Sequence, residues 1–312
     1  MWFEPGHVET VVEVVPPEAA LLLAALSFLG SIYVVAPLVL GELWYRNHER
    51  GLAWAAILLG AYGLVVALKA AVPVHRPTVD PPVAPAVLPE PLGFVYLLTI
   101  EPSGLAFPSG HALIAVVFWS LLAAAYLADR PRLGLATVVA VVTVVGVSRV
   151  ALAAHYPIDV VAGIALGIGY LGAVRGVQRH VDRDRAALIA IAVAVGAVAV
   201  IVSDGVKGPA VLGGALGLAL VRASASGHRT VLPATPGGVA ASGIGLAILA
   251  GVAAVVLLEP GRIAVGVVGL MAALIVGWTP LGVRRVRTRE VRLLPVSLRR
   301  QVGTDDAEVP GD

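Results

Sequence analysis

Cysteine is absent from this chain of 312 residues, and charged residues are scarce, at 13%. The first absence excludes disulfide bonds, thiol catalysis and cysteine-ligated metals. The scarcity of charge accompanies a hydrophobic content of 58% and a mean hydropathy of +0.91, which is more apolar surface than a soluble protein of this size could bury. The sequence therefore predicts an all-α fold, a polytopic bundle of transmembrane helices.

Basic residues are missing from residues 1–17, which instead carry Glu4, Glu9 and Glu13. This segment therefore lacks the positive n-region of a cleaved signal peptide, and we expect a short interfacial helix near residues 11–15. The whole chain has a net charge of +2 and a pI near 9.1, which could suggest nucleic-acid binding. Because basic residues of membrane proteins usually mark cytoplasmic loops, we expect no nucleic-acid partner.

Long apolar runs predict about nine spans, most of them close to the roughly 20 residues that a spanning helix needs. The predicted spans are residues 18–41, 51–69, 108–128, 133–150, 157–174, 186–202, 209–221, 238–258 and 263–280. We expect four regions: an extracytoplasmic segment (1–17), a core with the first five spans (18–180), a membrane extension with about four spans (181–283) and a basic cytoplasmic tail (284–312).

The positions of Lys and Arg predict the orientation. If the acidic N-terminus lies outside, most basic residues fall in inner loops and in the tail, as the positive-inside rule expects. The exceptions are Lys69, Arg76, Arg149, Lys207 and Arg262. The prediction is a multi-pass protein of the cell (plasma) membrane with a cytoplasmic C-terminus.

Three clusters of polar residues lie at the outer ends of predicted spans. In chain order they are Lys69 with Arg76-Pro77, then Pro108-Ser109-Gly110-His111, then Ser148-Arg149 with His155 and Asp159. Ionisable groups at the edge of a membrane are costly, so their default explanation is a functional site. Asp159 lies four residues after His155, a spacing that lets the two side chains meet over the first turn of a helix. A carboxylate on one ring nitrogen would leave the other free to attack or to carry a proton.

The remaining motif residues suit an anionic ligand. Arg149 can bind a phosphate through paired hydrogen bonds, and Ser109-Gly110 at a helix start directs free amides toward an anion. Taken singly, each cluster has an ordinary structural explanation, such as a capped helix or a lysine that extends to the interface. Together, in this order and on one face, they indicate a phosphoryl-transfer centre.

This combination resembles the type 2 phosphatidic acid phosphatase (PAP2) superfamily, whose signature is KxxxxxxRP, then PSGH, then SRxxxxxHxxxD. All three motifs match without substitution, and the resemblance covers about residues 52–174. The superfamily includes integral-membrane lipid phosphatases, isoprenoid diphosphate phosphatases, glucose-6-phosphatase and soluble vanadate haloperoxidases. The resemblance implies a membrane phosphatase that acts at the outer face on lipid phosphate monoesters or diphosphates, of the phosphatidic acid or polyprenyl diphosphate type.

The resemblance also implies a role for each motif residue. His155 would be the nucleophile that forms a phosphohistidine, Asp159 would orient it, and His111 would be the general acid. The phosphoryl oxygens would be bound by Lys69, Arg76, Ser109, Gly110 and Arg149. Because these groups can do the work of Mg²⁺ and no carboxylate cluster surrounds them, we expect no metal and no cofactor.

Two other functions remain open at this stage. A sugar-phosphate phosphatase of the same superfamily would need a wet pocket closed to lipid, and a transporter or channel would use the charged residues as a proton relay. The expected partners are the lipid phosphate or diphosphate substrate and membrane lipids, with a homo-oligomer as an option. An apolar patch at residues 94–98 could enter the bilayer and guide a lipid tail, or could simply pack.

Overall fold

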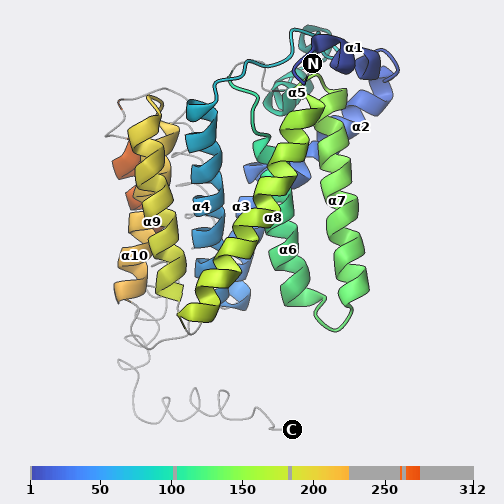
Figure 1. The fold of residues 1–312 in the computed structure, drawn as a ribbon. Helices are drawn as coiled ribbons and strands as arrows, with labels where there is room; N and C mark the ends of the chain where they lie inside the picture. The colour runs from blue at the N-terminus through green and yellow to red at the C-terminus, as the bar shows by residue number, and fades with distance from the viewer. Residues whose placement is uncertain (1, 101–103, 182–184, 225–260, 262–264, 275–312) are drawn as a thin grey trace, which may run out of the picture.

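The computed structural model describes residues 2–100, 104–181, 185–224, 261 and 265–274. Within these residues the chain is helical and contains no strand, so the predicted all-α fold is confirmed. Figure 1 shows the longer helices side by side as a bundle. The helices are α1 (Pro5–Val12), α2 (Pro17–Ser27), α3 (Ile32–Gly41), α4 (His48–Ala71), α5 (Leu92–Ile100), α6 (Gly110–Tyr126), α7 (Pro131–Ala151), α8 (Pro157–His180), α9 (Arg185–Val202), α10 (Lys207–Ser224) and Val265–Leu274.

Local sequence explains where several helices begin. Proline occupies the first turn of α1, α2, α7 and α8, where its missing N–H costs no helical hydrogen bond. Ser31, Asn47 and Ser109 cap α3, α4 and α6, and each side chain accepts a hydrogen bond from a backbone N–H of the first turn.

In the part of the chain that the structure describes, three helices, α4, α7 and α8, are long and apolar enough to cross a membrane. A fourth candidate is the pair formed by α1 and residues 17–30, which is bent by 115°. The predicted number of nine spans is not confirmed. Residues 18–41 are not one helix, because α2 runs into a short 3₁₀ turn and Ser31 then caps α3. The predicted span 238–258 and the basic tail lie outside the described residues, as do parts of the predicted span 263–280.

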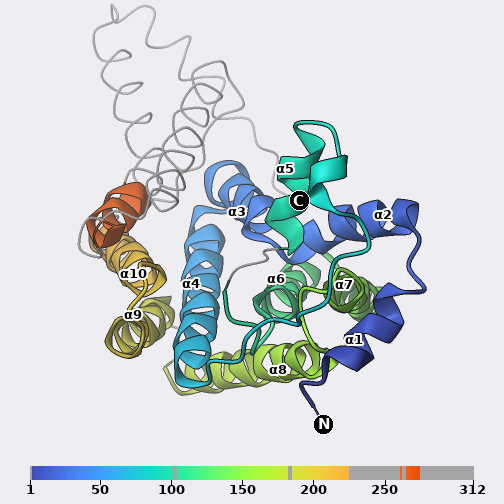
Figure 2. The ribbon, with the colours of Figure 1, turned by 90° about the horizontal axis from the view of Figure 1, so that it is seen from above.

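Helix α4 lies between two groups of helices, with α6, α7 and α8 on one side and α9 and α10 on the other (Figure 2). Its contact with α8 is fixed by Tyr170, whose buried hydroxyl donates a hydrogen bond to the carbonyl oxygen of Ile57 at 2.9 Å. Glycines let α8 approach α6 closely, since a Cβ at Gly167 would lie 2.9 Å from the Cβ of Val116. The core is therefore built from apolar side chains of α4, α6, α7, α8, α9 and α10.

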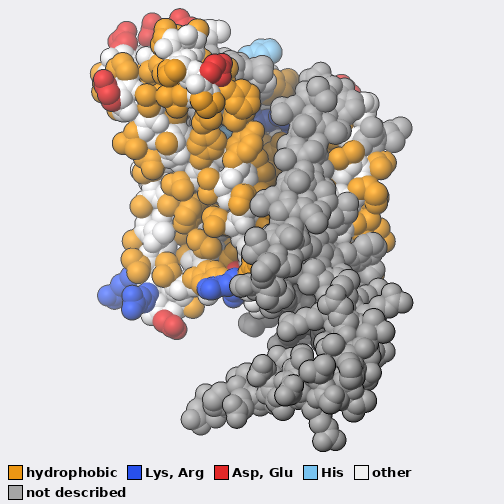
Figure 3. Space-filling view, turned by 180° about the vertical axis from the view of Figure 1, so that it is seen from behind, with side chains coloured by type: hydrophobic (Ala, Val, Ile, Leu, Met, Phe, Trp, Pro, Cys, Tyr) orange, Lys and Arg blue, Asp and Glu red, His pale blue; other side chains and the backbone are white. Residues whose placement is uncertain are grey.

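The surface has a broad apolar belt between two charged ends (Figure 3). We call the end where α4 and α7 finish and α6 and α8 begin the upper end, as drawn in Figure 1. Exposed acidic residues of the N-terminal segment lie at the upper end, and exposed Arg46, Arg130 and Arg132 lie at the opposite end. Leu135 of α7 and Ile168 of α8 are large apolar side chains that these helices leave exposed. An apolar belt on long apolar helices is the surface of a membrane protein.

Candidate active site

The three motifs meet at the upper end of the bundle. Lys69 lies in the last turn of α4, Ser109 precedes α6, and His155 lies in the short loop that joins α7 to α8. The second and third motifs are joined directly, because the backbone N–H of Ser109 donates to the carbonyl oxygen of Asp159 at 3.0 Å. The first and third are joined by Arg76, whose Nη1 donates to the carbonyl oxygen of Ala154 at 2.6 Å.

The loop before His155 is a tight turn closed on the end of α7. The backbone N–H groups of Ala154 and His155 both donate to the carbonyl oxygen of Arg149, each at 3.0 Å. Ala153 adopts a φ of 57° within this turn, a left-handed conformation that is uncommon for any residue other than glycine. Such conformations are stabilised by their surroundings and concentrate at functional sites. The turn therefore fixes the backbone position from which the side chain of His155 extends.

The His155 ring is paired with a buried carboxylate. Its Nδ1 lies 3.3 Å from Oδ2 of Asp159, and the side chains are 1% and 0% exposed. The same Oδ2 accepts a hydrogen bond from the backbone N–H of Tyr156 at 2.8 Å, which fixes the carboxylate over the first turn of α8. Because a carboxylate accepts the proton of Nδ1, Nε2 keeps its lone pair when the ring is neutral.

Three cations converge on this imidazole. Arg76, Arg149 and Lys69 each act electrostatically on His155, and the same three act on His111. Burial lowers the pKa of His155 well below the ordinary 6.5, and the positive charges of Arg76, Arg149 and Lys69 lower it further. His155 is therefore neutral at neutral pH, the state in which an imidazole can act as a nucleophile.

The cations are held in place by backbone carbonyl oxygens. The guanidinium of Arg149 is 0% exposed, and its Nη1 donates to the carbonyl oxygen of Thr99 at the end of α5. The ammonium of Lys69 donates to the carbonyl oxygens of Leu105 and Ala106. These contacts join α5 and the loop before α6 to the site.

The start of α6 completes the arrangement. The Ser109 hydroxyl accepts from the backbone N–H of Ala112 at 3.4 Å, and its side chain is fully buried. Gly110 is the first residue of α6 and His111 the second, so their N–H groups are among those that a helix cannot bond internally. The positive end of α6 therefore faces the same region as the cations.

Sequence analysis missed Gly163, which lets α8 lie against the second motif. A Cβ at this position would lie 2.5 Å from the carbonyl oxygen of Ser109. A signal was present in the sequence, since Gly163 and Gly167 form a small-xxx-small pair of the kind that brings membrane helices together. The contact of Thr99 with Arg149 had no such signal, because every residue carries a carbonyl oxygen.

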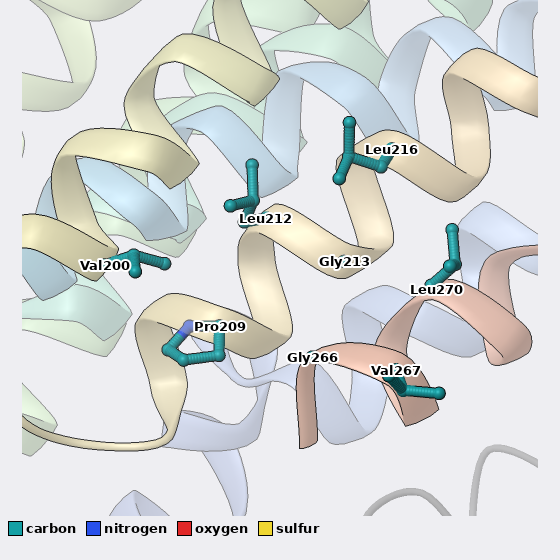
Figure 4. Close-up of a pocket in the computed structure, with 8 residues that line it drawn as sticks. All are labelled: Val200, Pro209, Leu212, Gly213, Leu216, Gly266, Val267 and Leu270. Carbon is teal, nitrogen blue, oxygen red and sulfur yellow. The ribbon is translucent and has the colours of Figure 1, made fainter. Parts of the chain in front are cut away.

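Two further features bear on ligands. Within the described residues, no group of three or more His, Asp and Glu side chains is arranged as metal ligands. An apolar pocket of about 590 Å³ lies between α9, α10 and the helix Val265–Leu274 (Figure 4). None of the motif residues lines this pocket. Its lining consists of Val200, Pro209, Leu212, Gly213, Leu216, Gly266, Val267 and Leu270. The pocket is therefore separate from the site that the three motifs form.

Comparison with known families finds one match, to the PAP2 superfamily, over residues 50–183. Comparisons with curated proteins and with solved structures give no match. The matched region runs from the start of α4 beyond the end of α8, and it contains every motif residue from Lys69 to Asp159. The expected resemblance is confirmed over this region: residues 50–183 match the PAP2 superfamily.

Proposed function

We propose that this protein is an integral-membrane phosphatase that hydrolyses lipid phosphate monoesters or diphosphates through a phosphohistidine at His155. Membership of the PAP2 superfamily supports a phosphatase-type activity. The observation that carries the proposal is the convergence of Lys69, Arg76 and Arg149 on a buried, neutral imidazole whose Nδ1 faces Asp159.

The first step forms the phosphohistidine. Nε2 of His155 attacks phosphorus and the bond from phosphorus to the leaving oxygen breaks, while Nδ1–H stays hydrogen-bonded to Asp159 as the ring becomes positive. His111 gives a proton to the departing alkoxide or phosphate oxygen. The negative charge of the bound phosphate favours the protonated, acidic form of His111 before this transfer.

The second step releases inorganic phosphate. His111, now neutral, takes a proton from a water molecule whose oxygen attacks phosphorus. The bond from phosphorus to Nε2 breaks, its electron pair returns to His155, and both histidines regain their starting states. Charge on the three equatorial oxygens is neutralised in each step by Lys69, Arg76 and Arg149, with donors from Ser109 and Gly110.

The lipid nature of the substrate is supported by the position of the site. The motif residues lie at one end of an apolar belt, beside α5, which exposes Leu92, Phe94, Val95 and Leu97 by 39–54%. A phosphate on a lipid headgroup would reach this end while its chains stay in the bilayer. Exposed arginines gather at the opposite end. By the positive-inside rule, this supports our proposal that the site faces the outside of the plasma membrane and that the C-terminus is cytoplasmic.

The test is phosphate release by purified protein in detergent with EDTA. The substrates are phosphatidic acid, a polyprenyl diphosphate and glucose 6-phosphate, and the variant is His155→Ala. His180→Ala is the matched control, because His180 ends the same helix α8 and is exposed. We expect release from a lipid substrate that His155→Ala abolishes and His180→Ala retains. Cleavage of glucose 6-phosphate alone would favour a sugar phosphatase, and a folded protein that cleaves nothing would refute the proposal.

A further inference from the structure

The N-terminal segment, which precedes the residues matched to the PAP2 superfamily, packs directly on the candidate active site. We propose that Phe3 is a positioning residue of the phosphatase reaction, whose ring holds the loop that carries His155 against the loop that leads into α6, the helix whose second residue is His111. This inference rests on the proposed function and adds to it a residue outside the three motifs.

The ring of Phe3 contacts one aromatic ring from each of the two loops. Its centroid lies 5.5 Å from that of Tyr156, at an interplanar angle of 82°, and 6.1 Å from that of Phe107, at 87°. Both are edge-to-face pairs of favourable geometry. Tyr156 directly follows His155 in the sequence, and Phe107 directly precedes the Pro108-Ser109 pair. Phe3 therefore bridges the loop that contains His155 and the loop that leads into His111 at the start of α6.

Helix α1 extends this contact to the first motif. Val8 of α1 is 0% exposed and belongs to one apolar cluster with Ala106, Ala153 and Tyr156. Val74 and Val79, on either side of Arg76, pack against the same cluster. Seen from above in Figure 2, α1 lies beside α7 and α8 at the upper end. The N-terminal segment therefore shares one apolar cluster with residues of all three motif-bearing loops.

The position of Tyr156 explains how a contact at Phe3 reaches the reacting ring. The backbone N–H of Tyr156 donates to Oδ2 of Asp159, and this oxygen faces Nδ1 of His155. A shift of Tyr156 would therefore move the carboxylate and the imidazole together. On the other side, the bond from Ser109 to Asp159 joins the same loops from within the bundle. Phe3 acts as the outer of two connections between them.

The same segment borders the buried surroundings of His155, because Val8 packs in one apolar cluster with Ala153 and Tyr156 of the loop that carries this ring. The charged and titratable groups that face this ring are Lys69, Arg76, Arg149, His111 and Asp159. On α1 and at the residue before it, the ionisable side chains Glu4, His7 and Glu9 are exposed. Burial is the largest cause of the lowered pKa of His155, ahead of the three cations. Loss of this packing, if it lets water reach the ring, would therefore raise the pKa of His155 toward its ordinary value.

The experiment compares Phe3→Ala with Phe3→Tyr, which keeps the ring, and with Trp2→Ala, since Trp2 is 70% exposed. All are made in the full chain and assayed with phosphatidic acid in detergent over a range of pH. We expect kcat of Phe3→Ala to fall roughly 10- to 100-fold, the range produced by misplacing a reacting group by about 1 Å or less, with a much smaller change in KM. We expect the acid limb of its kcat/KM profile to move to higher pH, and Phe3→Tyr to restore both values.

The outcomes separate this inference from the proposed function. If the unmodified protein and Trp2→Ala cleave phosphatidic acid and Phe3→Ala cleaves it equally well, Phe3 has no positioning role while the phosphatase stands. A lower kcat with an unmoved acid limb would mean loss of folded protein, and it would also overturn the inference. If the unmodified protein cleaves no phosphatidic acid, the polyprenyl diphosphate is used in the same comparison, and failure there refutes the proposed function itself.

Discussion

Gly163 of α8 lies against the backbone at the start of α6, and we predict that Gly163→Ala separates these helices and inactivates the protein. The added Cβ would lie 2.5 Å from the carbonyl oxygen of Ser109 and 3.2 Å from the Cβ of Ala112. Close carbon-to-oxygen contacts in proteins are ordinarily about 3.3 Å or longer, so the helices must separate by roughly 0.8 Å. The oxygen belongs to the backbone and cannot rotate away as a flexible side chain would.

This separation of α6 and α8 would lengthen the hydrogen bond that joins the second and third motifs. The Ser109 N–H donates to the carbonyl oxygen of Asp159, so a displaced Ser109 moves α6 and His111 away from His155. Misplacement by about 1 Å can cost on the order of 100-fold in rate, and overpacking costs about 1–3 kcal/mol in stability. For Gly163→Ala we therefore expect kcat/KM to fall on the order of 100-fold and the unfolding midpoint in detergent to fall by a few degrees.

The matched controls are Gly169→Ala and Gly172→Ala in the same helix. A Cβ at either position meets nothing within 4 Å, and both glycines are exposed. Alanine there should leave activity unchanged and favour the helix by up to about 1 kcal/mol. If Gly163→Ala behaves like these two variants in phosphate release and in thermal unfolding, the argument that α8 lies too close to Ser109 to accept a Cβ is refuted.

Three further predictions concern buried groups. Arg149→Lys should lower kcat/KM on the order of 100-fold because an ammonium cannot replace the planar, buried guanidinium. The control Arg132→Lys changes an exposed residue at the opposite end and should have no effect. Equal activity of the two variants would contradict this prediction. Because the pKa of His155 is lowered, kcat/KM, corrected for the phosphate ionisation near pH ~6, should not fall as pH decreases through 6.5 and should decline only at lower pH; an acid limb at or above 6.5 would contradict it. Tyr170→Phe removes the hydrogen bond to the carbonyl oxygen of Ile57, and it should cost about 1 kcal/mol of stability with kcat unchanged, measured by thermal unfolding and phosphate release.

The motif residues could be predicted because their chemistry depends on residue type. Cations and histidines at the edge of apolar runs are costly, so Lys69 and Arg76 stand out in the sequence without any structure. The spacing of His155 and Asp159 also predicted that the two side chains would meet, and they lie 3.3 Å apart. The roles given to these residues remain predictions until the variants are assayed.

The fold was predictable where hydropathy and helix length agree. Residues 51–69, 133–150 and 157–174 were predicted as spans and lie within α4, α7 and α8. Residues 18–41 were predicted as one span because hydropathy averages over a window and does not detect a turn. In the structure Ser31 accepts a hydrogen bond from the N–H of Tyr33 and starts a new helix within that apolar run.

The contacts of the N-terminal segment could not be predicted from the sequence. A short interfacial helix was expected near residues 11–15, but α1 spans Pro5–Val12 and turns Val8 inward onto the site. One aromatic residue near a chain end carries no periodic signal, and its partners Phe107 and Tyr156 are distant in the sequence. The proposed catalytic groups therefore lie within residues 50–183, which match the superfamily, whereas the proposed positioning residue Phe3 lies before them. Two chains with identical motifs would then differ in the pH range of their activity according to what covers the site.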